Sequence, residues 1–178
     1  MNFSTIFETE RLVIRCFNVL DVDPFFDMMS NYKVMNPIPQ KVFTKQESDA
    51  KLAELIRLYT QKIEKKIWAV ALKNNPELIG LCGLLVNDEQ NPELAYRLRE
   101  KFWQKGYGTE IYEGLILYGF ENLKFKLITA DVWVENLKSV KILEKRMQQE
   151  KEFFNKKDNC VDRRYQLTKK AWLQQNAS

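Results

Sequence analysis

Residues 102–114 read FWQKGYGTEIYEG, and this stretch decides how the rest of the chain is interpreted. It places two of the chain's six glycines, Gly106 and Gly108, one residue apart in front of a segment with a helical pattern. Glycine permits a left-handed backbone and lets a ligand approach without a Cβ in the way. The first N–H groups of a helix lack intrahelical partners and lie at the positive end of its dipole. The turn therefore predicts an anion site, with a pyrophosphate as the expected ligand.

The same two glycines also fit a plain strand-to-helix turn, and their spacing alone does not decide between the two interpretations. No G-K-[ST] follows, so the turn is not a P-loop, and the third glycine of the dinucleotide fingerprint is missing. Lys101 and Lys105 add positive charge nearby, which favours the anion site.

Composition limits the chemistry that the chain can perform. No window approaches about 18 uncharged apolar residues and the start lacks a basic region before an apolar run, so we expect neither a membrane span nor a signal peptide. The absence of histidine excludes Ser-His-Asp and Cys-His pairs and a histidine base. Cys16, Cys82 and Cys160 lack metal-ligand spacing, so we expect no metal site and a reducing cytoplasm. The mild net charge of +4 does not imply nucleic-acid binding.

The pattern of the remaining residues predicts a mixed α/β domain in the order β-α-α-β-β-β-α-β-α-β-β. Strands are expected at 11–17, 67–73, 78–86, 93–99, 126–134, 150–154 and 161–168. Helices are expected from Pro24 with Asp23 as cap, after the capping box of Thr44 and Glu47, over 109–123, and from Asn136 through Met147. The second of these helices carries its apolar face on Leu52, Leu55, Ile56, Tyr59 and Ile63.

Trp103-Gln104-Lys105-Gly106-Tyr107-Gly108-Thr109-Glu110 resembles motif A of the GNAT (Gcn5-related) N-acetyltransferases, and Trp103 at its first position resembles the RimJ/RimL branch. Four further blocks in the same order look like that family: ETERLVIR (8–15), ELIGLCGL (77–84), VENLKSVKILEK (134–145) and YQLTKKAW (165–172). The resemblance implies one GNAT domain over 1–178. Its fold would be α/β (α+β), with a mixed, mostly antiparallel sheet that splays at the acyl-CoA site and about four flanking helices.

The resemblance also implies that acetyl-CoA is the co-substrate. Backbone N–H groups in the turn would bind the pyrophosphate, and the residues concerned are Gln104, Lys105, Gly106, Tyr107, Gly108 and Thr109. Backbone groups of Tyr96, Leu98 and Arg99 would line the pantetheine arm. Asn136 matches the family asparagine that contacts pantetheine, and it fits a plain helix N-cap equally well.

The implied reaction is direct transfer of an acetyl group to an amine, such as a ribosomal or other protein N-terminus or a small amine. Glu93 matches an acidic family residue and is the candidate general base, with a solvated loop-edge glutamate as the alternative. Many relatives protonate the departing thiolate with a tyrosine at the position of Leu143, so Ser139 is the nearest candidate hydroxyl, against a packing role. Glu135 and Asp131 can attract a cationic amine, although a solvated face explains both.

Two departures from the family pattern weaken parts of this picture. Gln104 replaces a usual glycine, and the helix after Asn136 lacks the glycine that normally ends it. A non-catalytic acyl-CoA-binding or regulatory module is therefore the alternative function, and a ribosome- or RNA-associated domain ranks last. The sequence does not identify the acceptor, and a monomer or a homodimer is expected.

Overall fold

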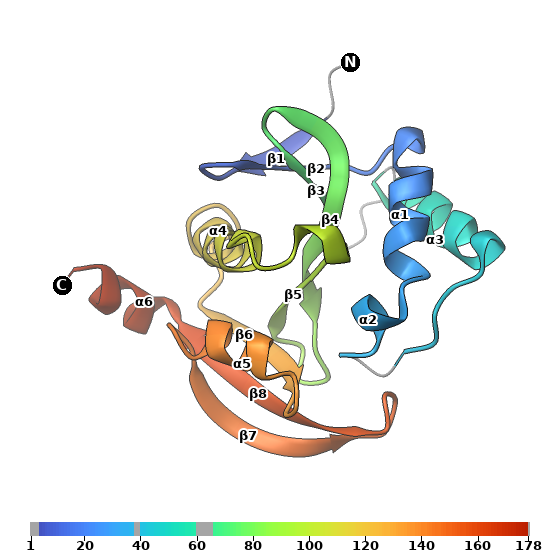
Figure 1. Cartoon of the computed structure of the whole chain (residues 1–178). Helices are drawn as coiled ribbons and strands as arrows, with labels where there is room; N and C mark the ends of the chain where they lie inside the picture. Colours follow the sequence, from blue (N-terminus) through green and yellow to red (C-terminus); the bar gives the residue numbers. More distant parts are fainter. Residues whose placement is uncertain (1–3, 38–39, 60–65, 178) are drawn as a thin grey trace.

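An eight-stranded sheet carries the fold, and its strands follow the order β1-β2-β3-β4-β5-β6-β8-β7 (Figure 1). The computed structural model describes residues 4–37, 40–59 and 66–177. The strands are β1 (Thr5–Glu8), β2 (Leu12–Arg15), β3 (Lys66–Leu72), β4 (Asn75–Val86), β5 (Pro92–Leu98), β6 (Leu127–Trp133), β7 (Gln148–Asn155) and β8 (Cys160–Thr168). Every neighbouring pair is antiparallel except β5 and β6, which confirms the mixed, mostly antiparallel sheet.

Six α-helices occur in the described part of the chain, two more than expected. They are α1 (Val22–Met29), α2 (Tyr32–Met35), α3 (Lys45–Leu58), α4 (Tyr107–Glu121), α5 (Leu137–Leu143) and α6 (Lys169–Asn176). The additional ones are the short α2 and the C-terminal α6. Figure 1 shows α1 to α3 on one side of the sheet and α4 on the other. Two apolar clusters fill these two sides, one around α4 and one beneath α1 to α3.

Local signals place α3 correctly and misplace α1. Thr44 and Glu47 form the predicted capping box, with the Thr44 hydroxyl accepting from the Glu47 N–H at 3.2 Å. The predicted cap of α1 at Asp23 is wrong, because the helix begins at Val22 after a 3-10 turn over Val19–Asp21. Asp21 is buried at that junction, where its carboxylate accepts from Arg15, so a tertiary ion pair fixes the helix start. Ile63 lies outside the described residues.

The helix α5 ends earlier than its apolar pattern predicts. Met147 lies beyond the helix but is buried, and the chain enters β7 at Gln148. Glu144 caps α5 with a right-handed backbone, so the exit proceeds without the glycine that relatives place there. The predicted closing hairpin is β7 and β8, which pair along their length.

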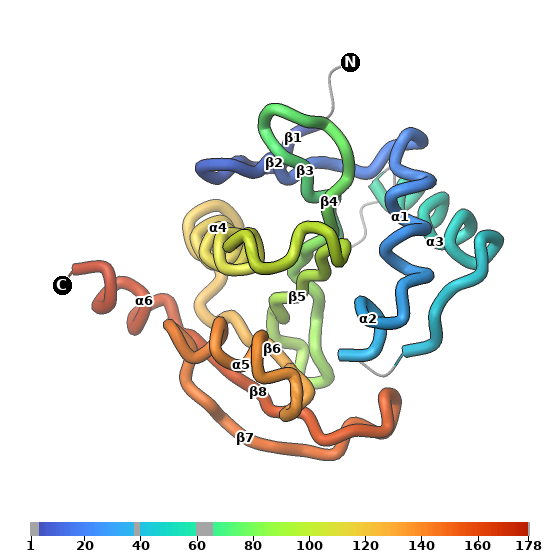
Figure 2. The backbone as a smooth tube through the Cα atoms, in the orientation of Figure 1, coloured from blue at the N-terminus to red at the C-terminus, as the bar shows by residue number. Residues whose placement is uncertain are grey.

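The sheet opens between β5 and β6. β5 pairs with β4 from Pro92 to Leu98, whereas its pairing with β6 is limited to Glu93 opposite Thr129. Beyond that point the two strands diverge. Figure 2 traces the chain from β5 through the glycine turn into α4 and back to β6, so the turn lies at the open end of the divergence.

Candidate active site

The glycine turn forms an uncapped helix start. Gly106 precedes α4 with a left-handed φ of +81°, and no side chain caps this helix. The first N–H groups of α4 are therefore available to a ligand. Gln104 is also left-handed, with φ of +60°, a conformation that glycine adopts most readily, so the structure fits the glycine that the resemblance implies for this position. Trp103 fixes the approach to the turn, because its indole Nε1 donates to the Leu98 carbonyl at 2.9 Å.

The turn between β1 and β2 supports this helix start from outside. The Glu110 carboxylate accepts from the Thr9 hydroxyl at 2.6 Å and from the Arg11 backbone N–H and Nε, both at 2.7 Å. Arg11 also donates to the Lys105 carbonyl at 3.0 Å. Burial raises the pKa of Glu110, but the hydrogen bonds from Thr9 and Arg11 outweigh it and hold the value below its usual range. The Arg11–Glu110 ion pair thus fixes the backbone of the glycine turn.

A cleft of about 680 Å³ runs through the divergence of β5 and β6. Eight of the predicted site residues line it: Tyr96, Leu98, Gln104, Gly106, Gly108, Thr109, Asn136 and Ser139. A Cβ on Gly108 would stand 3.3 Å from the Tyr96 ring, so glycine keeps the cleft open at this point. An elongated molecule with an anionic end therefore fits the cleft and the turn together.

Lys105, Tyr107, Glu93 and Arg99 do not line this cleft. Lys105 and Tyr107 belong to the turn itself. The Arg99 side chain is buried and pairs with Asp27 at 2.7 Å, and its backbone N–H donates to the Ile79 carbonyl. The structure thus engages both groups of Arg99 within the fold instead of presenting them to a ligand.

Hydroxyl and amide groups gather where α5 meets β5. The Asn136 side chain accepts from the Ser139 N–H at 3.3 Å, so it caps α5 as the alternative interpretation predicts, and the residue also lines the cleft. Tyr96 and Ser139 both line the cleft. Burial raises the pKa of the Tyr96 hydroxyl, although the Ser139 side chain acts to lower it, so both hydroxyls are neutral proton donors near neutral pH.

Glu93 lies at the apex of the divergence, on the strand residue that pairs with Thr129. Burial, followed by the nearby Asp131 carboxylate, raises the pKa of Glu93 to about 7. Such a carboxyl group can accept and release a proton at physiological pH.

A cluster of acidic side chains lies on the same side of the sheet as Glu93. Arg164 on β8 is buried and pairs with Asp131 at 2.7 Å, Asp88 at 2.6 Å and Glu89 at 3.0 Å. Three carboxylates thus surround one guanidinium, and Glu93 adds a fourth acidic group close to Asp131. Asp131 is therefore an ion-pair partner, which corrects its interpretation as a solvated side chain, whereas Glu135 is exposed at the cleft.

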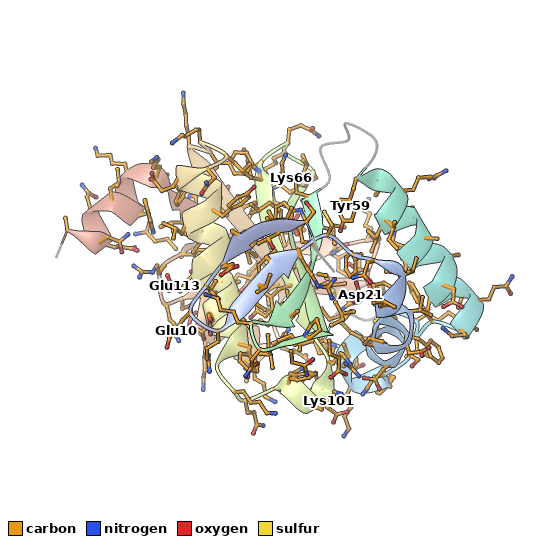
Figure 3. The ribbon with its side chains drawn as sticks, turned by 90° about the horizontal axis from the view of Figure 1, so that it is seen from above. Glu10, Asp21, Tyr59, Lys66, Lys101 and Glu113 are labelled. Atoms are coloured by element: carbon orange, nitrogen blue, oxygen red, sulfur yellow. The ribbon has the colours of Figure 1, made fainter. Side chains whose placement is uncertain are left out.

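A second hollow of about 890 Å³ lies on the outer side of α4. It runs between the β1–β2 turn and α6, and Figure 3 shows Glu10 and Glu113, two of its lining residues, on the same side of the molecule. It contains neither the β5–β6 divergence nor the Tyr96–Ser139 pair. We therefore place the chemistry in the smaller cleft.

Comparison with known proteins identifies the family. The family model described as acetyltransferase (GNAT) domain matches residues 11–146. The chain is a member of the GNAT acetyltransferase family. It is 30% identical over 137 residues to an uncharacterized N-acetyltransferase, p20, of Bacillus licheniformis, which covers 76% of this chain and 77% of the relative.

Solved structures agree with this assignment. A GNAT-family acetyltransferase from Bacillus anthracis has a TM-score of 0.78 at 25% identity and covers 92% of this chain and 98% of its own. RimL, a ribosomal L7/L12 α-N-protein acetyltransferase solved with coenzyme A, has a TM-score of 0.76 at 16% identity and covers 94% and 99%. The family model and the p20 relative indicate an N-acetyltransferase, so the alternative of a non-catalytic module gains no support.

The GNAT chain holds several site features that sequence reasoning missed. Arg11 and Thr9 lie in the quoted opening block, but nothing in it indicates their contact with Glu110, about a hundred residues away. The sequence motif indicates a role for the Tyr96 backbone, but nothing in the motif indicates a role for the Tyr96 side chain. Within the described residues, no group of acidic, cysteine or histidine side chains is arranged to hold a metal, and no helix could cross a membrane. Cys16, Cys82 and Cys160 are all free thiols.

Proposed function

We propose that this enzyme transfers the acetyl group of acetyl-CoA to a primary amine by direct attack. The observation that carries the proposal is the β5–β6 divergence, which has an uncapped helix start at one end and a carboxyl group of raised pKa at the other. Acetyl-CoA supplies an activated thioester. The N–H groups at the start of α4 bind its pyrophosphate, and the exposed edges of β5 and Asn136 hold the arm that follows.

Glu93 takes a proton from the ammonium group of the acceptor, directly or through one water, and the neutral amine then attacks the thioester carbonyl. Its pKa of about 7 leaves a useful fraction ionised at neutral pH. An α-amine with a pKa near about 8 is already partly neutral, whereas a lysine near about 10.4 needs far more from a base. One carboxyl group of this kind therefore suits a protein N-terminus or a small amine of lowered pKa. The acidic group around Arg164 would attract the cationic form.

Ser139 donates a proton toward the departing sulfur, and Tyr96 stands behind it as a second hydroxyl. Their shared place along the cleft and the influence of Ser139 on the pKa of Tyr96 support this role. It would replace the tyrosine that many relatives carry where this chain has Leu143. RimL shares the fold of this chain and acetylates a protein N-terminus, and we propose an acceptor of the same kind. We also predict a cytoplasmic location.

Release of free thiol tests the proposal. The protein is mixed with acetyl-CoA and separate pools of peptides with free N-termini, polyamines and aminoglycosides, and thiol is followed with a chromogenic reagent. We expect acceptor-dependent thiol release that Glu93→Gln lowers at least a hundredfold. A matched control, Glu121→Gln on the far end of α4, should keep the wild-type rate. A thermal shift with acetyl-CoA but no release with any pool would refute transfer and restore the binding-module alternative.

A further inference from the structure

Three arginines of this protein are buried, whereas Arg97 is half-buried. Arg15, Arg99 and Arg164 each pair with a carboxylate at 2.7 Å, contributed by Asp21, Asp27 and Asp131. This pattern is expected, because a buried charge without a counter-charge is costly. Arg97 on β5 differs from all three.

The Arg97 guanidinium has only uncharged partners in the part of the chain that the structure describes. One terminal nitrogen donates to the Met35 sulfur at 3.0 Å and to the Met29 sulfur at 3.6 Å, and the other donates to the Gln40 side-chain oxygen at 3.3 Å. Thioether sulfur is a weak acceptor. Burial lowers the pKa of Arg97, and the more distant Asp158 opposes this less strongly. The side chain still carries its charge, because arginine stays protonated in proteins.

Arg97 lines the active-site cleft on the side away from the hydroxyl pair. Successive residues of a strand point to opposite faces, so Arg97 points away from the face of Tyr96 and toward the face of Glu93. Its partners Met29 and Met35 belong to α1 and α2, on the side of the sheet opposite α4. The cleft on that side is lined by Val34 and Pro37. Arg97 therefore faces the acceptor rather than the coenzyme arm.

We infer that Arg97 binds a carboxylate carried by the acceptor. The inference rests on the proposed function, because it takes the face of Glu93 as the side from which the amine approaches. A carboxylate matches the planar fork of a guanidinium and supplies the counter-charge that the fold omits here.

The spacing along β5 limits the acceptor further. Glu93 and Arg97 are four residues apart, which is about 13 Å along a strand. Side chains that reach toward each other shorten the span between the amine and the carboxylate. An extended peptide covers the remaining distance with two to four residues. The class is thus a primary amine with a carboxylate several ångströms away, as in a peptide whose second, third or fourth residue is acidic.

Binding of matched peptides tests the inference without relying on turnover. Hexapeptides with a free N-terminus, a C-terminal fluorophore and either Glu or Gln at positions two to four are titrated against the protein saturated with coenzyme A, and anisotropy is recorded. We expect the Glu peptides to bind about tenfold tighter or more. Arg97→Gln should bring the two affinities within about twofold, and Arg97→Lys should retain part of the preference. Lys73→Gln, which removes one positive charge far from the cleft, should keep it all.

Small amines form the second arm, with 6-aminohexanoate and hexylamine compared as competitors of the labelled peptide. The inference is supported if either arm shows a preference for the carboxylate and Arg97→Gln removes it. The arm that shows the preference tells whether the carboxylate belongs to a peptide or to a small amine. Equal binding in both arms, or a preference that survives in Arg97→Gln, overturns it. Preference without acetyl transfer would refute the proposed function alone. Transfer with equal kcat/KM for the acidic and amide peptides would refute the inference alone. Melting curves of each variant confirm that it is folded.

Discussion

Replacing Glu93 by glutamine should stabilise this protein at alkaline pH. Burial and the Asp131 carboxylate raise the pKa of Glu93 from an ordinary value of 4.5 to about 7 in the folded state. Below the unfolded value the carboxyl group is neutral in both states, so it has no effect. As pH rises from 4.5 through 7, the folded protein holds a proton that the unfolded chain has lost, and stability falls. At about 1.4 kcal/mol per pH unit, the full penalty above pH 7 is about 3 kcal/mol.

The assay is urea denaturation of both proteins at pH 5 and pH 8. Glu93→Gln should gain up to about 3 kcal/mol in free energy of unfolding at pH 8 relative to wild type, and markedly less at pH 5. Glu135→Gln is the matched control, because this glutamate lines the cleft next to the divergence but is exposed, and its gain should be close to zero at both pH values. A gain of the same size at pH 5 and pH 8, or no gain at pH 8, would refute the reasoning.

The same group predicts the pH dependence of catalysis. If Glu93 is the base, kcat/KM should fall about tenfold per pH unit below a midpoint near 7. Asp131→Asn removes a negative charge that raises this pKa, so the midpoint should move to lower pH. A midpoint that stays unchanged in Asp131→Asn would show that another group titrates. The ionised form of Glu93 would then destabilise the fold without taking part in catalysis.

Three further changes test the anion turn. Gln104→Gly should stabilise the fold by up to about 1.5 kcal/mol in thermal denaturation. It removes about 1–2 kcal/mol of left-handed strain from the folded state, and the greater freedom of glycine in the unfolded chain offsets about 0.5–1 kcal/mol of this gain. Gln90→Gly, also left-handed but outside the cleft, should behave alike. Gly106→Asp should abolish the thermal shift with acetyl-CoA, because its carboxylate would repel the pyrophosphate; a normal shift would contradict the site. Glu110→Gln should lower stability at pH 7 through loss of the Arg11 ion pair, and the difference should shrink as pH falls below about 4. A constant difference by urea denaturation would argue against the pair.

Local sequence signals predict those helices and strands whose ends are determined by interactions between residues close together in the chain. The capping box of α3 and the two apolar runs around a polar turn in the β3–β4 hairpin are of this kind, and both appear as expected. The start of α1 is different, because Asp21 forms an ion pair with Arg15 on another element. The strand β1 has four residues and pairs only with β2, which leaves a signal too short to separate from a loop.

The candidate site follows the same division. Gly106, Gly108 and Asn136 carry a linear motif and are brought to one cleft, as the resemblance implies. Arg97 carries no motif. Arg97 stands out because, among the described residues, the buried arginines pair with carboxylates and it does not. That contrast is visible only in the folded structure. Glu93 could be proposed from the sequence, but its raised pKa depends on burial and on Asp131, across the sheet.

The single backbone pair between β5 and β6 has a mechanical consequence. Strands β1 to β5 and strands β6, β8 and β7 form two sub-sheets that share one point of strand pairing, Glu93 opposite Thr129. Packing must therefore join them, and one apolar cluster does so by combining Leu94 of β5, Ile128 of β6 and Ile111 of α4. A coenzyme bound in the proposed position would lie between these strands and contact both halves. Its binding energy would then stabilise the contact between the two sub-sheets.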